Sequence, residues 1–442
     1  MSDAPEKQQP ATPGTAEAGH SPAYARYVLG VLFVVYVINF IDRQVMSVFI
    51  GPIQAEFGVS DTAMGLLVGF AFAVLYTFAG IPIARWADRG NRRTIITIGL
   101  ALWSAMTVAS GLARNFTQLF LARVMVGVGE AAGTPPAHSL IADYFPLNRR
   151  ATALAIYSAG VFVGAALAYL GGGYLREYFD WRTAFIVLGV PGLVFALVVR
   201  FTVREPRRGQ SEGLAIAAEA DSERPSFGAT LRFLLHSRSW VGLIVGSSFL
   251  SISGYGILMW GFEFLGRVHG LSPVATGQWM ALIVGVGGSL GTYLGGRITD
   301  RFIEASPARA MRVPALCTLA AFPCGLVYLL GGPVWLALLG FFPFYVLQNI
   351  YIPMMYSVNQ SLARLDMRAT ASAVLLFIIN IIGAGAGPFI VGALSDFYAG
   401  AHGAASIRYA LVTVLISIPA GYVCFEYAAR HFRADLQRVR GC

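Results

Sequence analysis

The chain has 442 residues, of which 56% are hydrophobic and only 12% are charged, and its mean hydropathy is +0.63. Soluble globular proteins carry roughly 25% charged residues, because their surface must be wetted. The composition therefore argues against a large soluble enzyme, a nucleic-acid-binding module and a disordered protein, and it predicts an integral membrane protein. The net charge of +9 does not indicate a nucleic-acid partner, because most of the arginines lie in short connections between apolar stretches.

A membrane-spanning helix needs about 20 mostly apolar residues. Twelve such stretches follow one another, near residues 27–53, 61–87, 94–112, 116–141, 150–173, 182–203, 238–264, 273–299, 312–332, 334–358, 369–395 and 406–428. Most connections between them are very short, so neighbouring helices must be antiparallel. The exception is a hydrophilic, turn-prone segment between the sixth and seventh stretches. The predicted fold is an all-α polytopic membrane protein, with twelve transmembrane helices in two pseudo-symmetric bundles of six.

The expected division of the chain follows from these stretches. Residues 1–25 are rich in Ala, Pro, Gly, Glu and Gln and contain no signal peptide, and we expect a disordered cytoplasmic tail there. The predicted domains are a first bundle over residues 26–204, a cytoplasmic linker over 205–237, a second bundle over 238–430 and a cytoplasmic tail over 431–442.

The arginines predict the orientation. With the N-terminus inside, the outer connections hold five of the 32 basic residues and the spans hold two, which leaves 25 on the side of both termini. The five outer residues are Arg114, Arg176, Arg182, Arg267 and Arg408. Because cytoplasmic loops carry an excess of Lys and Arg, both termini are expected in the cytoplasm, and the expected location is the inner or plasma membrane.

A short charged segment occurs twice, at equivalent places in the two halves. The first copy is Ala84-Arg-Trp-Ala-Asp88-Arg89-Gly90-Asn91-Arg92-Arg93, and the second is Gly296-Arg-Ile-Thr-Asp300-Arg301. A small residue four before the aspartate lets two helices approach, the carboxylate can cap a neighbouring helix, and the arginines can form ion pairs. The predicted gating residues are Asp88, Arg89, Arg92, Arg93, Asp300 and Arg301. The alternative is an ordinary basic loop that only sets the topology.

Twelve spans, two halves, a central linker and this duplicated loop resemble the Major Facilitator Superfamily. Span eleven adds Gly383-Ala-Gly385-Ala-Gly387-Pro388, which is similar to the glycine–proline helix element of that family. The first loop copy departs from the family pattern, with Ala84 where glycine is usual, and the second lacks the trailing basic pair. The resemblance implies a secondary transporter in which two bundles rock around a central cavity, with a proton gradient and no other cofactor.

Four charged residues of the first half fall inside predicted spans, namely Asp42, Arg43, Arg123 and Glu130. Charges at bilayer depth are costly, so each is a functional hypothesis by default. Asp42 lies roughly 24 Å along its helix from the inner surface and Arg123 about 12 Å from the outer surface, so we expect the two to meet. Tyr36 and Asn39 share a polar stripe with Arg43. The alternative is a set of permanent structural ion pairs.

The stretch Asn39-Phe-Ile-Asp42-Arg43 and the run Arg123-x3-Gly127-x-Gly129-Glu130 resemble the spinster branch of the superfamily, whose members are proton-coupled carriers of lysophospholipids and sphingosine phosphate-type lipids. This resemblance implies headgroup recognition and proton coupling at the matching positions. We predict substrate binding by Arg43, Arg123, Tyr36 and Asn39, and proton coupling by Asp42 and Glu130. No catalytic or metal-binding residues are predicted. Glu263 is expected to form an outer-rim helical pair with Arg267 four residues later.

The second half offers an apolar set that an acyl chain could contact. Its members are Phe262, Met280, Phe341, Phe342, Phe344, Tyr345, Met354, Met355 and Phe377. The predicted substrate is therefore an amphipathic small molecule or lipid, and the expected partners are membrane lipids, with no nucleic acid and a monomeric chain. A proton-coupled symporter of small organic anions remains the main alternative. A channel and a membrane-embedded lipid enzyme, for which His138 and Asp143 have a suggestive spacing, are more distant ones.

Overall fold

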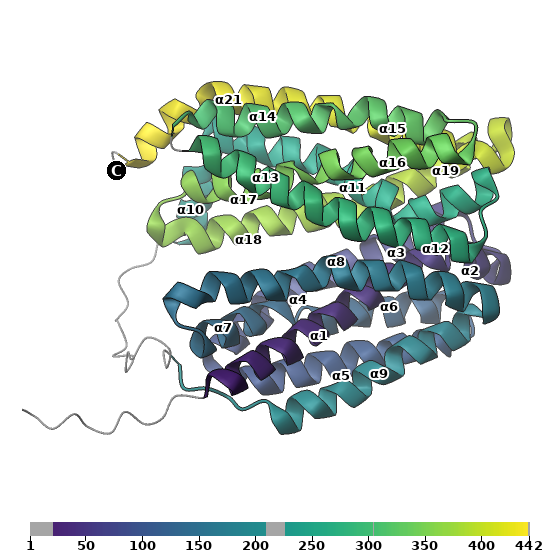
Figure 1. Ribbon diagram of the computed structural model, residues 1–442, viewed down its shortest axis with the longest axis horizontal. Coiled ribbons are helices and arrows are strands. Elements are labelled where there is room, and N and C mark those ends of the chain that lie inside the picture. Colours follow the sequence, from purple (N-terminus) through teal and green to yellow (C-terminus); the bar gives the residue numbers. More distant parts are fainter. Residues whose placement is uncertain (1–20, 209–225, 304, 441–442) are drawn as a thin grey trace, which may run out of the picture.

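The computed structural model describes residues 21–208, 226–303 and 305–440, and these are helical, with no strand among them (Figure 1). Most of the expected N-terminal tail, residues 209–225 of the expected linker and residues 441–442 lie outside the described part. Within it, the first helix already begins at Pro22, a short helix occupies the end of the linker, and the last helix continues to Arg440.

The first half consists of nine helical segments. They are α1 (Pro22–Val48), α2 (Ile50–Phe57), α3 (Asp61–Val68), α4 (Phe70–Arg89), α5 (Arg92–Gly111), α6 (Phe116–Glu130), α7 (Thr134–Tyr144), α8 (Leu147–Tyr178) and α9 (Trp181–Thr202). Several begin at a side-chain cap that satisfies a free backbone N–H group, as Asn115 does for α6 and Asp180 for α9.

The second half begins with a short helix at the end of the linker. Its helices are α10 (Phe227–Leu235), α11 (Arg238–His269), α12 (Pro273–Leu282), α13 (Gly288–Ile303), α14 (Pro307–Leu319), α15 (Ala321–Leu330), α16 (Val334–Asn349), α17 (Tyr351–Ser361), α18 (Arg368–Ile378), α19 (Gly387–His402), α20 (Ser406–Leu415) and α21 (Ser417–Arg440). Wider π-helical turns at Ile283–Gly287 and Ile379–Ala386 join α12 to α13 and α18 to α19. Such turns often mark functional positions.

Each of the twelve expected stretches falls on helix. Ten helical segments of the described residues are long and apolar enough to cross a membrane. The count is smaller than twelve for two reasons. The stretch 116–141 is broken between α6 and α7, and the last segment covers residues 370–439 in one piece although the chain turns at Gly403, whose φ is 55°.

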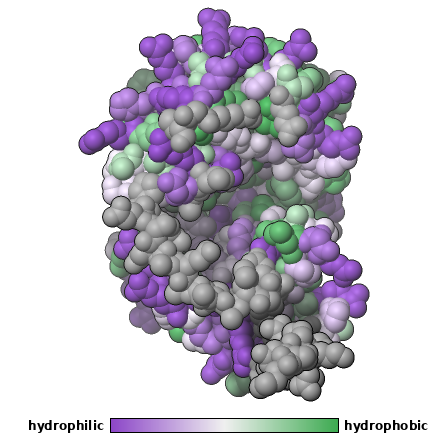
Figure 2. All heavy atoms as spheres, turned by 90° about the vertical axis from the view of Figure 1, so that its left-hand side faces the viewer, coloured by the Kyte–Doolittle hydropathy of each residue, from purple (hydrophilic) through white to green (hydrophobic). Residues whose placement is uncertain are grey.

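The two halves lie side by side, with the first half below and the second above in Figure 1. We call the end that carries Pro22 and Arg440 the terminal end and the opposite end, which carries Gly58 and Gly270, the far end. Figure 2 shows the terminal end, where hydrophilic residues gather over both halves.

At the far end the halves touch along two helix crossings, α8 with α12 and α3 with α19. Glycines make both crossings close. A Cβ atom on Gly173 would lie 2.6 Å from the carbonyl oxygen of Pro273, and one on Gly392 would lie 2.2 Å from that of Asp61. Real Cβ atoms do not approach so closely, so any larger residue at these positions would push the two halves apart.

Candidate functional site

An ion pair between α1 and the end of α6 forms the centre of the site. Arg43 donates from Nη2 to Oε2 of Glu130 at 2.9 Å and from Nε to the same oxygen at 3.2 Å. The Glu130 side chain is 0% exposed, whereas that of Arg43 is 16% exposed. The pair therefore has one fully enclosed member and one that is partly exposed.

Three aromatic rings surround the Arg43 guanidinium. Its Cζ atom lies 4.8 Å from the ring centre of Phe40, 4.7 Å from that of Phe72 and 4.9 Å from that of Tyr76. A cation over an aromatic face within about 6 Å is attracted by the ring quadrupole. Sequence reasoning missed these rings, although Phe72 and Tyr76, four residues apart on one helix face, offered a signal. The three rings therefore help to hold the guanidinium beside Glu130.

Arg123 and Asp42 come together as expected, but not as an ion pair. Nη2 of Arg123 donates to the backbone oxygen of Asp42 at 3.3 Å, and both residues are buried. Neither carboxylate oxygen of Asp42 has a hydrogen-bond partner among the described residues, and the same holds for Nε and Nη1 of Arg123. A buried charge without a partner is costly, and such costs are concentrated at functional sites.

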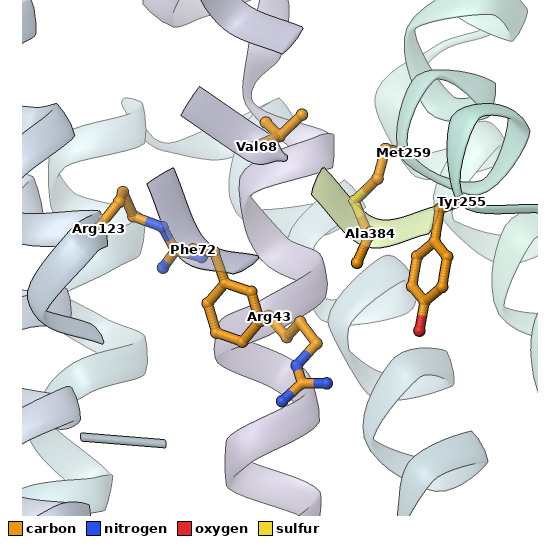
Figure 3. Close-up of a pocket in the computed structure, with 7 residues that line it drawn as sticks. All are labelled: Arg43, Val68, Phe72, Arg123, Tyr255, Met259 and Ala384. Atoms are coloured by element: carbon orange, nitrogen blue, oxygen red, sulfur yellow. The ribbon is translucent and has the colours of Figure 1, made fainter. Parts of the chain in front are cut away.

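A small pocket lies between the two arginines, at the boundary between the halves (Figure 3). Its lining residues are Arg43, Val68, Phe72 and Arg123 from the first half and Tyr255, Met259 and Ala384 from the second. The ring of Phe72 lies between the two guanidinium groups, and Ala384 belongs to the π-helical turn before α19. The pocket therefore combines two cationic groups with mostly apolar walls.

The two other predicted binding residues lie beside this centre. The Tyr36 ring stacks on that of Tyr157 with centroids 4.3 Å apart and touches Phe40 edge-on at 5.1 Å. Asn39 is buried on α1, one helical turn before Arg43. The polar stripe predicted on α1 thus faces the Arg43–Glu130 pair.

The expected apolar wall is mostly the core of the second half instead. Of its nine residues, Phe341 is 0% exposed and stacks on Tyr328 at 4.1 Å, and Phe344, Met280 and Met354 are equally enclosed. Helix spacing alone cannot say which apolar face turns toward the other bundle. Tyr255, Met259 and Ala384 supply the second half's part of the pocket, and the Phe377 ring lies 5.5 Å from that of Phe78 in the first half.

The first copy of the duplicated loop forms its ion pairs within the first half, at the terminal end. Arg92 is buried, pairs with Asp143, and donates from Nε to Glu205 Oε1 at 2.7 Å. The backbone N–H of Arg93 donates to the other oxygen of Glu205 at 2.9 Å. Asp88 and Arg89 at the end of α4 are exposed, as are their repeats Asp300 and Arg301 on α13. Among the described residues, no ion pair joins the two copies.

Charged residues join the halves at the far end instead. Glu263 of the second half accepts from Arg176 Nη1 of the first at 3.0 Å and from the backbone N–H of Gly51 at 3.3 Å. Arg267 of the second half donates to both oxygens of Asp61 in the first, at 2.9 and 3.0 Å. The expected pair of Glu263 with Arg267 is also present, at 3.0 Å. We call Asp61, Arg176, Glu263 and Arg267 the far-end network.

Comparison with known proteins places the chain in a family. Residues 32–388 match the Major Facilitator Superfamily. The chain is 33% identical over 418 residues to an MFS-type efflux pump of Mycolicibacterium smegmatis, with 94% of this chain and 95% of the relative covered. It is 28% identical over 304 residues to a probable L-galactonate transporter of Escherichia coli, with 68% and 66% covered. A crystal structure of a bacterial homologue of the human lysosomal transporter Spinster, inward-facing and unoccupied, is similar with a TM-score of 0.86 and 32% identity, with 94% and 99% covered.

Proposed function

The chain belongs to the Major Facilitator Superfamily and is similar to its spinster branch, and on that premise we propose that it carries a lysolipid or sphingosine phosphate-like substrate by proton-coupled alternating access. As a member of this superfamily it is a multi-pass membrane transporter. We further propose that it works as a monomer, with the proton gradient as its energy source and no bound cofactor.

The pocket between Arg43 and Arg123 supports an amphipathic substrate. Two guanidinium groups suit an anionic headgroup, because they can donate several charge-assisted hydrogen bonds to phosphate oxygens. Val68, Phe72 and Met259 give an apolar continuation for the chain. A buried methylene contributes about 0.8 kcal/mol, but a chain that leaves the bilayer gives up nearly the same amount. Affinity should therefore depend on the headgroup, and chain length should act through fit.

The Arg43–Glu130 pair supports coupling to protons. A phosphate that binds Arg43 competes with Glu130 for the same donors, because both contacts of Glu130 come from this one guanidinium. Glu130 would then be an enclosed carboxylate without its counter-ion, a state that proton uptake relieves. Asp42, whose carboxylate has no hydrogen-bond partner among the described residues, is the second candidate proton carrier. Substrate and proton are thus linked through one ion pair.

The arrangement of the halves supports an inward-facing state. The far-end network and the two glycine crossings close the far end, and the exposed Asp88 and Asp300 leave the terminal end unlatched. The excess of arginines at the terminal end supports our proposal that this end, and with it both termini, faces the cytoplasm. The similar Spinster homologue is also described as inward-facing.

A carrier of small organic anions is the second candidate, because the chain also resembles a probable L-galactonate transporter. A sugar acid carries several hydroxyl groups, and a site that selects it must pair them. Among the seven residues that line the pocket, only Tyr255 offers a hydroxyl group. The mostly apolar walls therefore favour the amphipathic substrate.

Purified protein in proteoliposomes tests the proposal. We expect labelled lysophosphatidylcholine or sphingosine phosphate to show counterflow, which a carrier produces and a channel or an enzyme does not. We also expect Asp42→Asn or Glu130→Gln to abolish the accumulation of sphingosine phosphate that a proton gradient drives. Glu426→Gln is a matched control, because Glu426 pairs with Arg312 and Arg430 inside the second half. Wild-type pH dependence in both site variants would rule out Asp42 and Glu130 as coupling groups.

A further inference from the structure

The charges at the centre of the first half sum to zero. Two carboxylates, Asp42 and Glu130, lie with two guanidinium groups, Arg43 and Arg123. Asp42 and Glu130 are each 1% exposed and Arg123 is 2% exposed. Arg43 pairs with Glu130, and Arg123 donates to the backbone of Asp42, the neighbour of Arg43 in sequence, so the four residues form one group whose total charge matters more than any single pair.

The helices that pack against this group add no further charge among the described residues. They contribute Tyr76 from α4, Thr107 from α5, Tyr157 from α8 and Tyr255 from α11. Tyrosines are neutral at physiological pH. On α7, His138 contacts the Tyr157 ring at 5.4 Å rather than any of the four charged side chains. With both carboxylates and both guanidinium groups ionised, the empty site is therefore neutral as a whole.

A net charge enclosed in the protein interior is costly, because little water is left to solvate it. A zwitterionic headgroup adds no net charge to the site. A headgroup with one negative charge would leave the loaded site with a charge of −1 unless one proton from solution binds a carboxylate. Glu130 is the carboxylate that would accept this proton, because the headgroup displaces it from Arg43. We propose that the number of protons carried with each substrate equals the net negative charge of that substrate. This inference rests on the proposed transport function, but it concerns the charge of the headgroup and not the tail.

Two lysolipids with the same acyl chain test the rule on the wild-type protein. Lysophosphatidylcholine is zwitterionic and lysophosphatidylglycerol carries one negative charge. In proteoliposomes that contain a pH-sensitive dye, we expect one proton per molecule of the glycerol lipid and none for the choline lipid. A potassium diffusion potential should change neither rate, because both loaded carriers are neutral. Equal proton ratios for the two lipids, or transport that follows the potential, would overturn the proposal.

The same assay separates this inference from the function on which it rests. If neither lysolipid is transported but galactonate is, the proposed lipid substrate is wrong, and the charge rule is tested with sugar acids instead. It then predicts one proton for galactonate, which has one carboxylate, and two for galactarate, which has two. A single fixed ratio for both sugar acids would contradict the rule.

Charge-changing variants give a second readout. Asp42→Asn raises the charge of the empty site to +1, so lysophosphatidylglycerol should move without a proton, and accumulation should be lost while exchange persists. The double variant Asp42→Asn with Arg123→Gln returns the empty site to zero, and the ratio should return to one proton per lipid. This ratio does not depend on affinity, so weaker binding does not obscure it. A double variant that stays uncoupled would refute the rule, and if the variants do not fold, the wild-type comparison decides.

Discussion

Replacing Glu263 by glutamine should shift the protein away from the conformation seen in the structure. Glu263 is 4% exposed and accepts three hydrogen bonds, from Arg176, Arg267 and the backbone of Gly51. Two of these donors belong to the other half of the molecule. Glutamine has nearly the same shape, but it removes the negative charge and leaves Arg176 without a carboxylate partner in the far-end network.

The magnitude follows from the surroundings of the pair. Breaking a buried ion pair by removing one partner typically costs 3–5 kcal/mol. The cost here should be smaller, about 2 kcal/mol, because Arg176 is 19% exposed and also donates to the carbonyl oxygen of Val48. Since 1.4 kcal/mol corresponds to a factor of ten, the ratio of far-end-closed to far-end-open molecules should fall by about 30-fold.

Spin labels at the far end can measure this shift. Leu112, after α5, and Trp335, near the start of α16, lie in different halves and are 63% and 63% exposed. Labelled cysteines at both sites, in a variant whose native cysteines are serine, should show a longer distance population in Glu263→Gln. Glu426→Gln should leave the distances unchanged, because its two arginine partners lie in its own half. Distances in Glu263→Gln that match wild type would refute the latch role of the far-end network.

Four further changes have expected outcomes. Asp88→Asn should favour the inward-open state, so cysteines at the terminal end should react faster with a membrane-impermeant reagent; no change would count against gating. Arg123→Ala should weaken the binding of lysolipids of every chain length alike, whereas Ala384→Leu, in the pocket wall, should weaken the binding of long chains selectively. Thermal-shift titrations with a series of chain lengths test both, and the opposite pattern would show that the headgroup does not lie at Arg123. The main cause of the lowered pKa of the Glu56 carboxyl is its hydrogen bond with Arg182. This contact stabilises the fold above the unfolded-state pKa, near 4.3. The stabilisation is lost as the pH falls through the lowered folded-state pKa. Glu56→Gln should therefore lower the melting temperature at pH 7, by an effect worth no more than about 1 kcal/mol because the pair is exposed, and this difference should vanish in acid; a difference that persists in acid would assign it to packing.

The course of the helices was predictable, but not every interruption of them was. Long apolar stretches must be helical in a bilayer, since every backbone polar group must be paired internally. The break at Gly69 depends on a partner helix, because a Cβ atom there would lie 2.3 Å from the carbonyl oxygen of Gly385, more than 300 residues away. The break between α6 and α7, in contrast, has a local signal, because Pro135 and Pro136 stand in the first turn of α7, where proline is tolerated.

The members of the candidate site were predictable because charges at bilayer depth are costly, and their pairing was not. Counting residues from the two surfaces placed Asp42 beside Arg123, which is correct, but it could not show that Arg123 donates to the backbone oxygen of Asp42 and not to its carboxylate. The same count could not show that the neighbouring Arg43 reaches Glu130. Glu263 was recognised only as a helical partner of Arg267, because its contact with Arg176 exists only where two separately folded bundles meet.

The most direct test of the account compares wild-type protein with Glu130→Gln in proteoliposomes that contain either lysophosphatidylglycerol or galactonate as the substrate. The account predicts that a proton gradient drives accumulation of the lysolipid by the wild type, that galactonate accumulates poorly, and that Glu130→Gln exchanges the lysolipid without accumulating it. Accumulation of galactonate equal to that of the lysolipid, or undiminished proton-driven accumulation by Glu130→Gln, would contradict it.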